Sequence, residues 1–68
     1  MSNADLKAHY HEGLKLRFLE LRRRRDAMSD PRYTIEELWA LHDMAKEGVY
    51  PDGRFSDNDC NVWSLLKH

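Results

Sequence analysis

The chain has 68 residues and a single cysteine, Cys60. A chain of this length forms at most one domain, residues 1–68, close to the lower limit for a stable core, and one cysteine excludes an intramolecular disulfide. No apolar run is long enough to span a bilayer, and no secretory signal is present, which predicts a cytoplasmic protein without a membrane contact, of a size that suits a bacterial or phage source. Because "MSNA" is typical of a vector-derived leader or a disordered end, no expectation is based on residues 1–4.

The net charge of −1 hides a polarity along the chain. Residues 1–33 contain eight Lys or Arg against five Asp or Glu, a net charge of +3. Residues 34–68 contain three against seven, a net charge of −4. Such a chain can attract a second copy of itself, or cover its basic half with its acidic half. A dedicated nucleic-acid binder is more often basic throughout.

The first expected helix runs from about Asp5 to Met28 and ends before Pro31. Its apolar residues recur at helical spacing and form one narrow stripe. The stripe consists of Leu6, Tyr10, Leu14, Phe18, Leu21 and Met28. A helix of about 24 residues is roughly 36 Å long and overhangs two shorter helices. The uncovered part of the stripe then requires a second copy, which predicts a homodimer.

The second expected helix has the clearest local signature. Thr34 followed by Glu37 is a capping box, and Tyr33 with Leu38 would form a hydrophobic staple around it. Gly48 suits the left-handed position that follows a helix. The expected apolar face comprises Ile35, Leu38, Leu41, Ala45 and Val49.

A short turn and a last helix complete the chain. Residues 51–53 ("PDG") favour a tight turn within a small hairpin-like insert. Ser56 and Asp59 form a second capping box, which opens a short helix. Its predicted buried face contains Val62, Leu65 and Leu66, with Trp63 at the flank and Cys60 roughly opposite. The expected fold is therefore all-α: a small three-helix domain with a long first helix and a hairpin-like insert before the last.

Four consecutive arginines occupy positions 22–25 near the end of the first helix. Consecutive helical residues point 100° apart, so the run spreads around the axis. A basic row forms only when two of the arginines are combined with residues from earlier turns: Lys7, His11, Lys15, Arg22 and Arg25. This row favours contact with an acidic protein surface or with phosphates. The alternative is a solvated helix end, with i,i+4 ion pairs from Glu20 to Arg24 and from Arg22 to Asp26.

The second helix is expected to present an acidic ridge on its outer face, formed by Glu36, Asp43 and Glu47. The ridge is either a solvated face or a docking surface for a basic partner, including the arginines of a second copy. Trp39 lies at the edge of the apolar face of the same helix. It either completes a thin core or anchors a partner, because Trp, Tyr and Arg dominate binding hot spots.

No catalytic, cofactor or metal signature is present. His9 and His11 lie about 200° apart on a helix and cannot share a metal there, and no third ligand joins His42 and Cys60. We therefore expect no enzyme and no cofactor, but a small helical regulator, adaptor or inhibitor that binds another protein. The alternative is a nucleic-acid-binding regulator that uses the basic row. The candidate partner-binding residues are Lys15, Arg22, Arg23, Arg25, Glu36, Trp39, Asp43 and Glu47.

Overall fold

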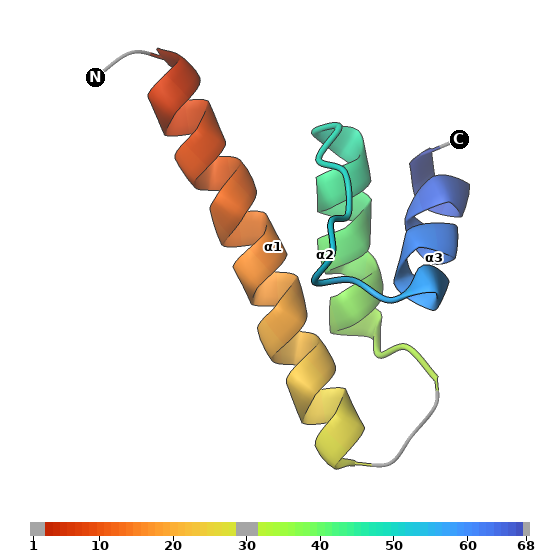
Figure 1. Ribbon diagram of the computed structural model, residues 1–68. Helices are drawn as coiled ribbons and strands as arrows, with labels where there is room; N and C mark the ends of the chain where they lie inside the picture. The colour runs from red at the N-terminus through yellow and green to blue at the C-terminus, as the bar shows by residue number, and fades with distance from the viewer. Residues whose placement is uncertain (1–2, 29–31, 68) are drawn as a thin grey trace.

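The computed structural model describes residues 3–28 and 32–67. Within these ranges the chain forms three helices and no strand: α1 (Asn3–Ala27), α2 (Ile35–Lys46) and α3 (Asp57–Lys67). α2 runs antiparallel to α1, and α3 packs on the side of α2 that faces away from α1 (Figure 1). The expected all-α fold with a long first helix is confirmed. Pro31 lies outside the described residues.

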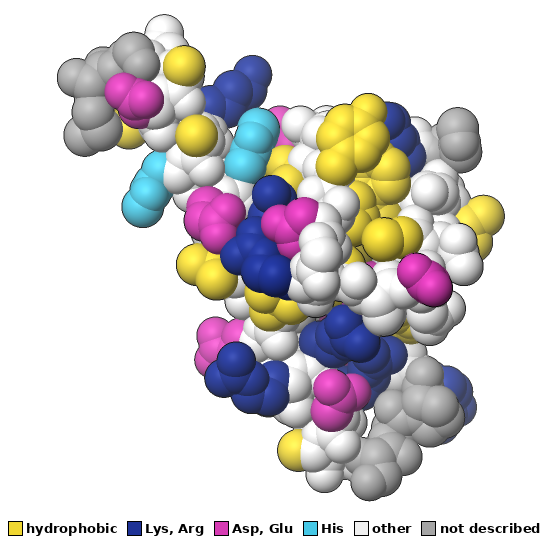
Figure 2. Space-filling view, viewed as in Figure 1, with side chains coloured by type: hydrophobic (Ala, Val, Ile, Leu, Met, Phe, Trp, Pro, Cys, Tyr) yellow, Lys and Arg dark blue, Asp and Glu magenta, His cyan; other side chains and the backbone are white. Residues whose placement is uncertain are grey.

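The length of α1 decides the shape of the molecule. Its 25 residues extend about 37 Å, whereas α2 has 12 residues and α3 has 11. The first turns of α1 therefore project beyond the other helices, and residues 3–10 are all exposed (Figures 1 and 2). Of the predicted stripe, Leu14 and Phe18 are buried and Leu21 packs at the edge of the core. Leu6, Tyr10 and Met28 are at least half exposed, so α2 covers only the middle of the stripe.

Both ends of α2 lie where the local sequence placed them. The Glu37 backbone N–H donates to Thr34 Oγ1 at 3.2 Å, and the Thr34 N–H donates to Glu37 Oε1 at 3.2 Å. After the helix, Gly48 has a φ of 70°. The Gly48 N–H donates to the Ala45 carbonyl, and the Val49 N–H donates to the Met44 carbonyl. This Schellman arrangement explains the glycine, because side chains other than hydrogen disfavour positive φ.

The buried face of α2 differs from the predicted one. Leu41, Ala45 and Val49 are buried as expected, but Ile35 is 73 % exposed and Leu38 is 40 % exposed. Their place in the interior is taken by Glu37, Ala40 and Met44. α2 lies between α1 and α3 and buries a broad arc against both, centred on residues that include a glutamate. A pattern of apolar residues could not reveal that arc.

The segment before α3 turns without β pairing. The Phe55 N–H donates to the Asp52 carbonyl at 3.0 Å, and the Phe55 ring stacks on Phe18 with centroids 5.2 Å apart. The second capping box is confirmed, since the Asp59 N–H donates to Ser56 Oγ and the Ser56 N–H donates to Asp59 Oδ2.

The buried face of α3 also differs from the predicted one. Trp63, expected at the flank, is buried, whereas Leu65, expected inside, is 77 % exposed. Cys60, expected to project away, packs against the core with Val62 and Leu66. The reason is that Asp59 is drawn fully into the interior, which turns the helix so that Trp63, four residues later, faces inward as well.

Candidate functional site

Two of the four arginines reach carboxylates inside the molecule. Arg22 Nη1 is 2.8 Å from Asp59 Oδ2, and Arg25 Nε is 3.3 Å from Glu37 Oε2. The second contact is an ion pair without a hydrogen bond, because the N–H is not aligned with the oxygen. Both carboxylates are fully buried, and both belong to capping boxes at the starts of α2 and α3. Each arginine therefore ties α1 to the first turn of another helix.

Tyr33 joins the two ion pairs. Its hydroxyl donates to Asp59 Oδ1 at 2.5 Å, and the Arg25 guanidinium lies 4.5 Å from the centre of its ring. Burial and the hydrogen bond to the Asp59 carboxylate raise the pKa of the Tyr33 hydroxyl well above its usual value of 10. We call these five residues the arginine–carboxylate cluster: Arg22, Arg25, Tyr33, Glu37 and Asp59.

The cluster changes the interpretation of the basic row. Arg25 is only 7 % exposed, and Arg22 points to the interior carboxylate of Asp59 rather than to Asp26. Lys15 is 3.5 Å from Asp52. The row is thus not a cationic surface, and Arg22 and Arg25 are not retained as partner-binding residues. Sequence spacing could not show that these two arginines are paired, because the acidic partner of Arg25 lies 12 residues away and that of Arg22 lies 37 residues away.

The two exposed arginines, Arg23 and Arg24, fit the alternative of a solvated helix end. Arg24 Nη2 lies 3.2 Å from Glu20 Oε1, the predicted i,i+4 pair. Arg23 is exposed on another side of α1, where it lines a shallow hollow with Leu19 and Asp26. A single run of four arginines therefore contains one buried residue, Arg25, one partly exposed residue, Arg22, and two exposed residues.

A second set of ion pairs holds the turn at residues 51–54 against α1. Arg54 Nη1 lies 2.7 Å from Glu12 Oε1, and Arg54 Nη2 lies 2.9 Å from Asp52 Oδ2. The Arg54 hydrogen bonds lower the pKa values of both carboxyl groups below their usual range. Lys15, which also contacts Asp52, is therefore part of a structural network on the surface of the molecule.

Three of the large apolar side chains that are exposed, Ile35, Leu38 and Trp39, gather on the outer side of α2. Trp39 is 60 % exposed and packs edge-on against His42, with ring centroids 5.6 Å apart. An open hollow of about 280 Å³ lies beside these rings. Its lining consists of Ile35, Leu38, Trp39, His42 and Leu66.

A second hollow, of about 390 Å³, continues this surface toward the end of α1. Leu21, Met28, Ile35 and the neighbouring charged residues Arg24 and Glu36 contribute to it. Ile35 lines both hollows, so the two lie next to each other. We call the surface along them the apolar strip: Met28, Ile35, Leu38, Trp39 and Leu66. Contiguous exposed apolar surface of this kind commonly marks an interaction site.

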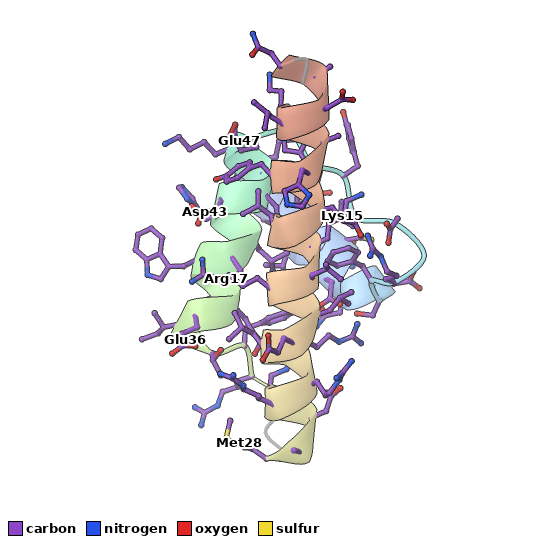
Figure 3. The ribbon with its side chains drawn as sticks, turned by 90° about the vertical axis from the view of Figure 1, so that its left-hand side faces the viewer. Lys15, Arg17, Met28, Glu36, Asp43 and Glu47 are labelled. Atoms are coloured by element: carbon purple, nitrogen blue, oxygen red, sulfur yellow. The ribbon has the colours of Figure 1, made fainter. Side chains whose placement is uncertain are left out.

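Charged side chains lie beside the apolar strip, on the side of α2 that is next to α1. Glu36, Asp43 and Glu47 follow one another along α2, as the acidic ridge predicted (Figure 3). Arg17 extends from α1 toward this ridge, whereas Lys15 lies on the other side of α1 (Figure 3). Within residues 3–28 and 32–67, no ion pair forms at Arg17, Glu36 or Glu47. Arg17 is not among the residues predicted to bind a partner, although its helical position, 20° from Tyr10, places it beside the exposed end of the stripe.

Among the described residues, no group of three or more His, Cys, Asp or Glu side chains is arranged to hold a metal ion. None of the helices in this part of the chain has both the length and the apolar character needed to cross a bilayer. In comparisons with known proteins, no protein-family model matches the chain, and no curated protein or solved structure matches it either. Its own surface is therefore the basis for inferring its function.

Proposed function

We propose that this chain is a non-catalytic cytoplasmic module that binds another protein through the apolar strip and acts as a regulator, adaptor or inhibitor. The observation that supports it is the exposure of Ile35 and Trp39, at 73 % and 60 %, beside an open hollow. Trp is among the residue types that dominate binding hot spots, and a regular helix holds it in place.

The energetics favour a partner for this surface. Burying an exposed Ile or Leu side chain stabilises a complex by about 1.5–3 kcal/mol, before the cost of association. The strip is long and narrow, and the acidic ridge runs beside it. An amphipathic helix that lays its apolar face on the strip fits such a surface.

We also propose that the chain forms a homodimer. Its accessible surface is 5005 Å², whereas a compact monomer of 8.1 kDa exposes about 4,500 Å². The projecting turns of α1, with Leu6 and Tyr10 half exposed, contribute to this surplus. Sedimentation velocity over 1–100 µM tests it directly, and a dimer is the expected result.

No observation favours the nucleic-acid alternative. Three cations of the basic row, Lys15, Arg22 and Arg25, already contact carboxylates of the chain. Non-specific duplex binding depends on such cations being available to phosphates. We expect no measurable duplex binding at 150 mM salt.

A photo-crosslinking amino acid at position 39 tests the protein-binding proposal. Irradiated in its cellular context, the chain is expected to form one dominant adduct with another protein. Trp39→Ala should weaken capture of that protein at least tenfold without changing the thermal midpoint. Leu65→Ala is the matched control, because Leu65 is 77 % exposed but lines neither hollow. Equal losses from both variants would contradict the proposed surface.

A further inference from the structure

The exposed face formed by α1 and α2 contains two parallel rows of opposite charge. On α2, the acidic ridge of Glu36, Asp43 and Glu47 lies beside α1 (Figure 3). On α1, the side chains within about 40° of one another on this side are all exposed. We call them the α1 row: Leu6, Tyr10, Arg17, Arg24 and Met28. Arg17 lies between the apolar residues of this row and has no carboxylate partner among the described residues.

We propose that two copies of the chain pack through this face, with the α1 row of each copy against the acidic ridge of the other. This inference rests on the proposed homodimer and assigns its surface. A two-fold axis that runs between the rows and parallel to them places each row opposite the oppositely charged row of the second copy. The contact is self-complementary and closes after two subunits.

The positions along the two rows also agree. Arg24 and Glu36 line the same hollow, so they lie at the same level of the molecule. Because α1 and α2 are antiparallel, Arg17 lies two turns further along, toward the level of Asp43 (Figure 3). An axis parallel to the helices preserves these levels. Arg17 of one copy then faces Asp43 of the other, and Arg24, which pairs with Glu20 of its own chain, faces Glu36.

A second copy fits this face better than an unrelated partner of one charge. A basic partner would be attracted by the acidic ridge and repelled by Arg17. An acidic partner would be attracted by Arg17 and repelled by the ridge. Another copy supplies both signs in the correct order. Leu6 and Tyr10 of the α1 row, which lie outside the apolar strip, are half exposed or more and supply area to bury.

Charge-swapped variants test the arrangement by sedimentation velocity on the purified chain. Arg17→Glu places like charges at both Arg17–Asp43 contacts of a dimer, and so does the variant Asp43→Lys. Each variant alone is expected to dimerise at least tenfold more weakly than the wild type. In an equimolar mixture of Arg17→Glu and Asp43→Lys, both contacts between positions 17 and 43 of the mixed dimer join opposite charges. The mixture is therefore expected to recover the dimer.

Arg23→Glu is the matched control, because it makes the same change of charge at an exposed residue on another side of α1. It is expected to dimerise like the wild type, and circular dichroism should show all variants to be equally helical. A dimer unaffected by the swaps, or a mixture that stays monomeric, would overturn the proposed face but leave self-association intact. A monomeric wild type at 100 µM would overturn the dimer altogether. The crosslinking experiment at position 39 would still test binding to another protein.

Discussion

Two positions of α2, only two residues apart, reverse the usual rule that apolar side chains are buried and charged side chains are exposed. Glu37 is fully buried in the arginine–carboxylate cluster, whereas Ile35 is 73 % exposed in the apolar strip. The carboxylate is accommodated because Arg25 and the Thr34 cap surround it. No helix in the described part of the chain covers the isoleucine. Burial in this small domain thus follows the availability of a partner more than the polarity of a side chain.

The largest effect is expected from breaking the cluster. Asp59→Ala leaves the Arg22 charge and the Tyr33 hydroxyl without their acceptor and removes the acid of a capping box. Loss of one member of a buried ion pair costs about 3–5 kcal/mol. Urea unfolding should show this loss. Asp57→Ala, at an exposed residue in the same first turn, should change the free energy of unfolding by less than about 1 kcal/mol.

Tyr33→Phe is expected to cost about 1.5–3 kcal/mol at pH 7, because it removes a hydrogen bond to a charged acceptor. The folded-state pKa of the hydroxyl is raised above 10, so its contribution is complete below pH 10 and is lost as the pH rises toward the folded-state pKa. Stability of the wild type should therefore fall above pH 10. The Phe variant should lack the part of this fall that comes from Tyr33. Parallel curves of unfolding free energy against pH for the two proteins would contradict a stabilising Tyr33–Asp59 hydrogen bond.

Thr34→Ala is expected to lower the free energy of unfolding by about 1 kcal/mol through loss of the α2 cap. Urea melts should differ in midpoint and share a slope. Thr34→Ser keeps the hydroxyl that accepts from the Glu37 N–H, so it should retain most of the stability. Identical midpoints for the wild type and Thr34→Ala would show that this hydrogen bond contributes nothing.

The smallest effect on stability is expected in the apolar strip. Ile35→Ser removes a mostly exposed side chain, so the free energy of unfolding of the isolated subunit should change by no more than about 0.5 kcal/mol. Chemical denaturation at low micromolar concentration measures it. A loss above 2 kcal/mol would mean that Ile35 belongs to the core and not to a binding surface.

Local sequence alone determined where α2 begins and ends and where α3 begins. The capping boxes at Thr34–Glu37 and Ser56–Asp59, and the glycine at position 48, act within three to five residues of the chain. Their geometry depends on the backbone beside them, so no tertiary information is needed to predict them. The overhang of α1 follows in the same way from the lengths of the three helices.

Only the tertiary structure decided which faces are buried and what the arginines do. Arg22 and Arg23 are equivalent by sequence, but one meets Asp59, 37 residues away, and the other meets solvent. The orientation of α3 also depends on distant residues. Asp59 contacts Arg22 and Tyr33 in the interior, and in this orientation Trp63 is buried and Leu65 is exposed. Amphipathic spacing describes one helix in isolation. The direction of its buried face depends on contacts with residues distant in sequence. The spacing of residues within the helix carries no information about those contacts.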